Sequence, residues 1–321
     1  MNFRQPIIIM GMHRSGTTML AKMLKQMGLF TGWDINDEHE AKFFFNRNEK
    51  ILNSCGGSWD NPLQIDQLLR RSRLQKRVAE TLIEDLRSIK AINFLGLKLY
   101  LKYRSIQKLD IAWGFKDPRN TFLLPLWLNV FPQAKVIHIY RNGIDIAQSL
   151  AVREEKRIED VLSDNSVLKN VMVIQKEQIV KENPLLFITR KIQNRWRKVS
   201  PLYKYGKLRI QPCISIDKGF ELWNEYIDRA FDHINSLNNP CLTIKYEDFL
   251  LQPKNYLTKL NNFCDLEADD DQIENIAKSV NVQRRFSYTS NEKLMEFYRS
   301  VSTNQWLEKL GYNLDIEKEM V

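Results

Sequence analysis

The sequence is poor in cysteine, histidine and long apolar runs. Its four cysteines form no Cys-x-x-Cys pair, which excludes a disulfide framework and argues against a structural zinc site. No Asn-x-Ser/Thr sequon occurs. The apolar run Pro6–Met10 is cut short by Gly11, and no other run approaches the roughly 18 apolar residues of a membrane span. These absences predict a cytoplasmic protein without stable membrane insertion.

Positive charge is in excess, with a net charge of +9 at pH 7. Basic residues gather between Arg190 and Arg209 and in a shorter cluster of Arg70, Arg71, Arg73, Lys76 and Arg77. Solvated helix faces would account for both clusters, and so would a field that attracts a polyanionic cofactor or an acidic acceptor. No nucleic-acid recognition motif accompanies the charge, so nucleic acid is not an expected partner.

The chain begins with a pattern of strand, loop and helix. The run Pro6–Met10 suits a strand buried on both faces. The segment Gly11–Thr17 forms the turn, and apolar residues then recur at helical spacing from Thr18 until Gly28, which favours a helix end.

The rest of the sequence alternates between strands and helices. Strands are predicted at Phe94–Leu99, Ala112–Phe115, Lys135–Tyr140 and Cys241–Tyr246, and helices at Leu123–Phe131, Ile144–Arg153, Gly219–Leu237 and Asn255–Cys264. This alternation predicts the α/β class, with a P-loop-like parallel sheet flanked by helices and binding sites at the carboxyl ends of its strands.

One segment departs from the alternation. Residues 153–215 are polar, basic and helical in pattern, with strand character only at Leu208–Ile214. We expect an inserted helical cap here, within a single domain that spans residues 1–321.

The loop after the first strand has the outline G-x-x-x-x-G-T-T, from Gly11 to Thr18. Glycines let successive N–H groups point inward, and the start of the helix adds partial positive charge, so this loop is suited to an anion. A triphosphate-binding loop needs lysine directly after the second glycine. Here Thr17 stands there and the cation comes earlier, at Arg14.

A second anion site is predicted after the strand Lys135–Tyr140. Arg141 stands at the tip of this strand, and Ser149 follows on the next helix. Because arginine offers a planar fork of donors, the two residues could converge on one phosphate. Two separate phosphate sites are required by few common cofactors.

Together these segments resemble the sulfotransferases that use 3′-phosphoadenosine 5′-phosphosulfate (PAPS), in the bacterial-type branch with an R-S-G-T-T loop. Four segments carry the resemblance: Arg14–Thr18, Arg141 with Ser149, the W-G-x-K-D-P-R segment Trp113–Arg119, and the Y-E-D segment Tyr246–Asp248 with Pro253. It covers residues 6–153 well and 220–262 moderately.

The resemblance implies a role for each site residue. Arg14 and Lys116 would neutralise the leaving side of the donor, and Arg14 to Met19 (Arg14, Ser15, Gly16, Thr17, Thr18, Met19) would bind its 5′-phosphosulfate. Arg141 and Ser149 would bind its 3′-phosphate. The product would be 3′,5′-adenosine bisphosphate (PAP), and no metal is expected.

An acceptor hydroxyl or amine must also lose a proton. Glu40 best matches the family's base, while Glu38 and His39 remain alternatives, as does an acidic surface turn without a catalytic role. The acceptor is expected to be a small molecule or a glycan, and the positive charge favours an anionic one. His138 and the run Phe43–Phe45 are interpreted as core residues. The oligomeric state is left open.

Two other functions remain open. A P-loop nucleotide kinase or NTPase would need a lysine after Gly16 and a carboxylate for Mg²⁺, and the first is absent. A non-catalytic nucleotide-binding protein on the same fold would keep the anion sites without turnover.

Overall fold

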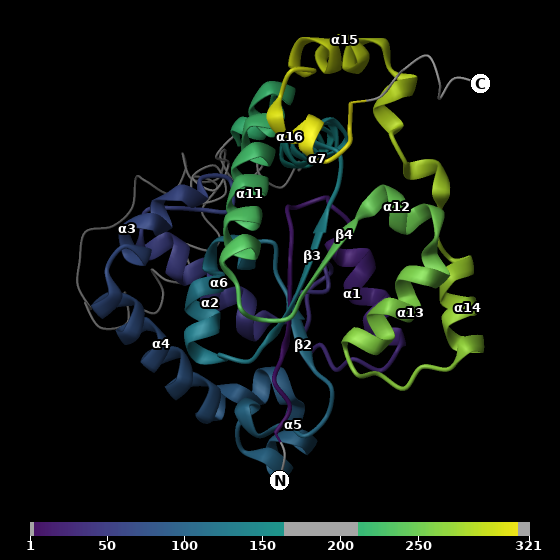
Figure 1. Cartoon of the computed structure of the whole chain (residues 1–321). Helices are drawn as coiled ribbons and strands as arrows, with labels where there is room; N and C mark the ends of the chain where they lie inside the picture. Colours follow the sequence, from purple (N-terminus) through teal and green to yellow (C-terminus); the bar gives the residue numbers. More distant parts are fainter. Residues whose placement is uncertain (1–2, 164–210, 314–321) are drawn as a thin grey trace, which may run out of the picture.

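The computed structural model describes residues 3–163 and 211–313. At its centre is a four-stranded parallel sheet in the order β2-β1-β3-β4 (Figure 1). The strands are β1 (Ile7–Met10), β2 (Gly114–Lys116), β3 (Lys135–Tyr140) and β4 (Cys241–Lys245). The expected α/β class with a parallel sheet is therefore confirmed.

Helices account for most of the remaining residues. Between β1 and β2 lie α1 (Thr17–Gln26), α2 (Lys42–Ser54), α3 (Asp66–Leu69), α4 (Ser72–Arg87) and α5 (Ile92–Tyr103). Helix α6 (Asn120–Val130) joins β2 to β3, and α7 (Gly143–Ser163) follows β3. The second described range adds α11 (Ile216–Ser236), α12 (Tyr246–Leu251), α13 (Pro253–Phe263), α14 (Asp270–Lys278), α15 (Glu292–Val301) and α16 (Gln305–Lys309).

The two faces of the sheet bury different helices, because alternate strand residues point to opposite sides. Ile8 and Met10 belong to the larger core cluster, with residues of α2, α6 and α11. Ile7 and Ile9 belong to a second cluster, with residues of α1, α12, α13 and α14. Figure 1 shows these two groups of helices on either side of the strands. The sheet is thus covered on both faces, as its β-branched strands predict.

One predicted strand is wrong. Residues Phe94–Leu99 lie in helix α5, whose helical geometry is interrupted by Gly96 with φ of +70°. Phe94 and Leu95 are buried, whereas Leu97 is exposed. A short apolar run alone does not distinguish a buried strand from a helix that packs one side, and here the helix is the observed solution.

The region predicted as a cap is described only in part. Residues 153–163 continue α7, which is longer than the predicted helix Ile144–Arg153. The described part of the possible strand Leu208–Ile214 is a 3₁₀ turn at Pro212–Ile214, so that prediction is wrong there. The remainder of the predicted cap, residues 164–210, lies outside the described residues.

Candidate functional site

A cavity of about 790 Å³ opens at the carboxyl ends of the strands. Arg14 follows β1, Lys116 ends β2, Arg141 follows β3 and Tyr246 follows β4, and all four line this cavity. Ten of the predicted site residues line it: Arg14, Gly16, Thr17, Thr18, Met19, Glu38, Glu40, Lys116, Arg141 and Ser149. Segments far apart in the sequence therefore meet at one edge of the sheet.

The loop between β1 and α1 has the backbone that an anion site needs. Gly16 has φ of +100°, and a Cβ at this position would lie 2.6 Å from the ring of Tyr246, so no larger residue fits. Helix α1 begins at Thr17. No backbone acceptor within the described residues takes the N–H groups of Thr17, Thr18 and Met19, as expected for the first turn of a helix. These N–H groups can therefore bind an anion.

Ser15 and His39 lie apart from the cavity lining. The buried Ser15 hydroxyl donates a hydrogen bond to the Met12 carbonyl at 2.7 Å, so this side chain braces the loop. His39 has φ of +58° in the turn before α2, and burial together with Lys22 lowers the pKa of its imidazole. Neither side chain forms part of the cavity lining.

A buried ion pair stands beside the loop. Lys116 Nζ lies 3.1 Å from Glu40 Oε1, and it is 3.3 Å from the Thr18 hydroxyl. The Lys116 and Glu40 side chains are only 1% and 5% exposed. The Asn36 amide donates a hydrogen bond to the other Glu40 oxygen at 2.8 Å. Burial raises the pKa of Glu40, and the nearby Asp117 raises it further, while Lys116 opposes both effects.

A second buried pair fixes the segment that carries Lys116. The Arg119 guanidinium donates to both carboxylate oxygens of Asp117, each at 2.9 Å. Asn48 from α2 donates to the same carboxylate, also at 2.9 Å. Asp117 therefore has a structural position, holding Arg119 at the wall of the cavity and ordering the residues that follow Lys116.

The second predicted anion site lies on the same cavity. Arg141 Nη2 donates to Asp145 at 3.1 Å and to the Arg284 carbonyl at 3.0 Å, and its guanidinium lies 4.9 Å from the Tyr246 ring centroid. Arg14 Nε donates a hydrogen bond to the Ser149 hydroxyl at 2.8 Å. Ser149 is thus bonded to the arginine of the loop, and this bond joins the two predicted anion-binding groups.

Glu38 and Glu40, the candidate bases other than His39, differ in burial. Glu38 is exposed, lines the cavity and accepts a hydrogen bond from Thr18 Oγ1 at 3.1 Å. Glu40 is buried against Lys116, as described above. The geometry therefore brings Glu38 and Glu40, but not His39, to the cavity wall.

Sequence reasoning missed several residues of the wall. His13, Trp59, Arg153 and Arg284 all line the cavity. Arg153 lies four residues after Ser149 on α7. Because residues at this spacing share one face of a helix, the sequence could have indicated that Arg153 faces the same site as Ser149. Arg284 lies far along the chain and had no comparable signal. The interpretation of His138 as a core residue is confirmed, since it is 1% exposed. Phe43 and Phe44 are likewise buried, whereas Phe45 lines the cavity.

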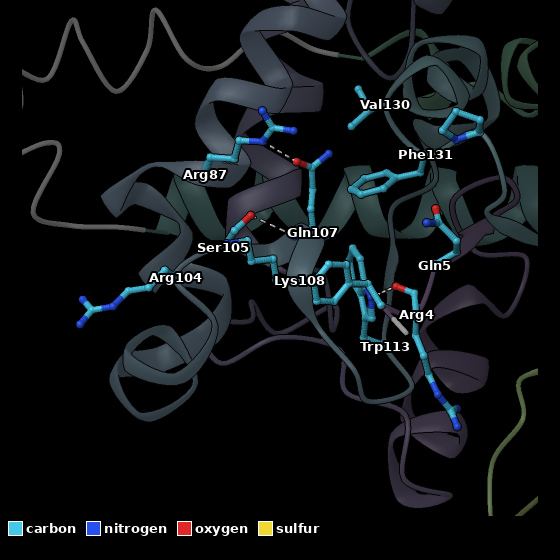
Figure 2. A pocket seen from close by; sticks show the side chains of 12 residues that line it. Arg4, Gln5, Arg87, Arg104, Ser105, Gln107, Lys108, Trp113, Val130 and Phe131 are labelled. Carbon is cyan, nitrogen blue, oxygen red and sulfur yellow. Dashed lines mark hydrogen bonds between the residues drawn. The ribbon is translucent and has the colours of Figure 1, made fainter. Parts of the chain in front are cut away.

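A second cavity of about 650 Å³ lies near the amino ends of the strands (Figure 2). It is lined by Trp113 and Phe131 and by the basic residues Arg4, Arg87, Arg104 and Lys108. In Figure 2 the guanidinium groups of Arg4 and Arg104 point away from Trp113, and Arg87 donates to Gln107 at 2.8 Å. These cations do not converge, so this cavity is a poorer candidate for an anion site.

Neither a membrane span nor a metal cluster occurs in residues 3–163 and 211–313. None of the helices in these ranges combines the length and apolar character needed to cross a bilayer. The same residues contain no group of three or more His, Cys, Asp or Glu side chains arranged to hold a metal ion.

Solved structures similar to this chain are distant in sequence. The sulfotransferase domain of the Synechococcus PCC 7002 olefin synthase is 18% identical, with 98% of this chain and 96% of that chain covered and a TM-score of 0.43. The sulfotransferase domain from the curacin biosynthetic pathway is 14% identical, with 94% and 99% covered and a TM-score of 0.45. The sulfotransferase STF9 from Mycobacterium avium is 14% identical, with 95% and 78% covered and a TM-score of 0.41.

The sequence itself was also compared with known families and proteins. No curated protein matches it. The family model described as the sulfotransferase family matches residues 6–163, about half of the chain, which hold the loop, Lys116, Arg141 and Ser149. Through this segment the chain belongs to the sulfotransferase family.

Proposed function

We propose that this protein transfers a sulfuryl group from PAPS to an acceptor hydroxyl or amine, as a single domain. The observation that carries the proposal is that Arg14 and Arg141, 127 positions apart in sequence, line one cavity. Two anion-binding groups on one cavity suit a nucleotide with phosphate on both sides of its ribose. Tyr246 and Arg284 lie outside the segment matched by the family model and still line this cavity, which supports one domain.

The described residues fit such a donor. The free N–H groups of the first turn of α1, with Arg14, are suited to the 5′-phosphosulfate. Arg141 and Ser149 are assigned to the 3′-phosphate. When bound, the donor supplies an activated sulfuryl group, whose transfer leaves PAP. Like phosphoryl transfer, this chemistry depends on positioning and on stabilising charge at the leaving oxygen.

Lys116 and Glu40 are assigned complementary tasks in the reaction. Lys116 is held at the cavity wall by its ion pair, where its ammonium group can stabilise negative charge on the leaving side. Glu40 takes the proton of the acceptor. Burial raises the pKa of Glu40, and a carboxylate whose pKa is nearer to the working pH is a better general base.

The donor is tested by ligand-dependent thermal stability. PAP, ATP with Mg²⁺, and AMP are added separately, and a ligand at about 100 times its Kd should stabilise the protein by about 2.7 kcal/mol. We expect PAP to stabilise it most. Stabilisation by ATP with Mg²⁺ but not by PAP would favour the nucleotide kinase instead, and PAP binding without turnover in a labelled-donor assay would favour a non-catalytic binding protein.

The assignment of residues is tested by two substitutions. Hydrogen bonds to charged partners contribute about 1.5–3 kcal/mol, so Arg141→Ala should weaken PAP binding by roughly 10- to 100-fold. Lys116→Ala should lower kcat more than it weakens PAP binding. Equal effects of the two substitutions on both quantities would contradict the separate roles of Arg141 and Lys116.

A further inference from the structure

One part of the cavity wall has no role in the donor site proposed above. It consists of His13, Trp59 and Arg153, and we call it the Trp59 corner. The guanidinium carbon of Arg153 lies 4.7 Å from the Trp59 ring centroid, and the His13 ring centroid lies 4.5 Å from the same ring. The Trp59 carbonyl accepts a hydrogen bond from the Tyr226 hydroxyl at 2.8 Å. Trp59 is therefore a fixed platform that contacts both polar side chains.

Arg153 has no carboxylate partner within 4.0 Å in the described part of the chain. The adjacent acid, Glu154, is used elsewhere: it accepts hydrogen bonds from Arg157 and from the Gln211 backbone N–H. By contrast, the more buried Arg119 is paired with Asp117. A guanidinium group stays charged, and a partly buried charge without a counter-ion is costly. Arg153 thus has no carboxylate in direct contact, since Glu154 and Glu38 act on it only from a distance, and a bound anion would supply the missing partner.

His13 supplies a second unsatisfied group in the Trp59 corner. Its Nε2 atom is buried and has no hydrogen-bond partner within the described residues. Burial lowers the pKa of His13 well below its usual value, and the neighbouring cations Arg153, Arg119, Lys116 and Arg14 lower it further. The imidazole is therefore neutral at pH 7, and the net charge of the corner is that of Arg153.

The Trp59 corner contains none of the groups assigned to the donor. The anion-binding N–H groups belong to Thr17–Met19, on the helix side of the loop, whereas His13 lies before them in the loop. The charges that act on His13 include those of Lys116 and Arg119, at and after the end of β2. Lys116, where transfer is proposed, therefore acts electrostatically on His13, and the corner meets the 3′-phosphate site at Ser149, one helical turn before Arg153.

We propose that Arg153, supported by Trp59, binds a carboxylate or sulfate group of the acceptor, so that the enzyme prefers anionic acceptors over neutral ones of the same shape. This inference rests on the proposed function and specifies the acceptor class for the same cavity. Arginine is suited to the task because its planar fork matches a carboxylate or sulfate with two parallel hydrogen bonds.

The test uses matched pairs of probes on the full-length protein saturated with PAP. One pair is 4-hydroxyphenylacetate and 4-hydroxyphenylacetamide, and the other is 4-nitrophenyl β-D-glucuronide and 4-nitrophenyl β-D-glucoside. Calorimetry gives the Kd of each probe. We expect the anionic member of at least one pair to bind about 10- to 100-fold more tightly to the wild type, the range for a charge-assisted hydrogen bond. Arg153→Gln should remove this ratio, and Arg153→Lys should restore part of it.

Lys156→Gln is the matched control, since it removes one positive charge from an exposed position on the same helix. It should leave the anionic-to-neutral ratio unchanged. Equal binding of both members of each pair by the wild type, or the same ratio in Arg153→Gln as in the wild type, would overturn the proposal. A tenfold loss of PAP affinity in Arg153→Gln would overturn it too, by assigning Arg153 to the donor. Failure of the proposed function is distinguishable, because the wild type would then either fail to bind PAP or show no transfer in the labelled-donor assay, and neither result depends on the ratio of probe affinities.

Discussion

Replacing Glu40 by glutamine should separate its structural contribution from its catalytic one. The substitution keeps the shape of the side chain and an oxygen that can accept from Asn36, but it removes the negative charge 3.1 Å from Lys116 Nζ. Lys116 would keep only its contact with the Thr18 hydroxyl at 3.3 Å. Because the Lys116 side chain is 1% exposed, little water can replace the lost carboxylate.

The expected loss of stability follows from this burial. Removing one partner of a buried ion pair costs about 3–5 kcal/mol, because the other charge stays buried without compensation. At about 2 °C per kcal/mol, the lower end of the range for large domains, Glu40→Gln should lower the Tm by roughly 6–10 °C. If Glu40 is also the base, kcat should fall by about 10²- to 10⁴-fold, while PAP should still bind.

Thermal denaturation of Glu40→Gln, Lys116→Met and the double variant measures the pair itself. The double variant should be more stable than Glu40→Gln alone, since it removes the uncompensated charge. A Glu40→Gln protein as stable as the wild type would refute the ion pair. A protein that loses stability but keeps kcat within tenfold would refute the role as base, and Glu38→Gln and His39→Asn would then be the variants to assay.

Two further predictions concern the loop and the core. Gly16→Ala should lower both stability and PAP affinity, because the added Cβ would lie 2.6 Å from the Tyr246 ring. Gly28→Ala is the control: Gly28 has a similar φ of +101° but nothing within 4 Å of the added Cβ, so this variant should show the cost of backbone strain alone. Equal losses of stability and of PAP affinity in the two variants would contradict the steric argument. His138 has a pKa of about 3, lowered by burial from 6.5, so the stability it contributes is fully present above about pH 6.5 and is lost as the pH falls toward 3. At pH 5 this loss of stability is about 2 kcal/mol. It is measured by comparing the free energy of unfolding of the wild type and of His138→Phe as a function of pH. Parallel curves for the two proteins would show the prediction to be wrong.

Local patterns predicted the part of the fold that positions the loop. The run Pro6–Met10 became β1, and Lys135–Tyr140 became β3 with the predicted bounds. In both segments a β-branched run is bounded by residues that favour turns, so local propensity and tertiary packing agree. The run Phe94–Leu99 had no such agreement. Its apolar residues pack in a helix whose other side is exposed, and Gly96 breaks that helix where a Cβ would lie 3.0 Å from the Trp33 ring.

The contacts of the candidate site were less predictable than its residues. Lys116 and Glu40 are 76 positions apart, and Arg14 and Ser149 are 135 positions apart. Motifs indicated that Arg14, Lys116 and Arg141 belong to one site, because they stand at the carboxyl ends of parallel strands, which share an edge. Spacing alone could not show that Ser149 would accept from Arg14, since that depends on how α7 packs beside the loop.

The cations of the cavity differ in whether they have a carboxylate partner. Lys116, Arg119 and Arg141 each have a carboxylate partner, and the side chains of these three cations are at most 12% exposed. Arg14 and Arg153 line the same cavity without such a partner in the described part of the chain. A paired cation is held in position by its carboxylate, whereas an unpaired one has no carboxylate that competes with a ligand for its charge. The pairs therefore fix Lys116 and Arg141 at the places where they are proposed to meet the donor, and Arg14 and Arg153 can bind ligand charge without a competing carboxylate.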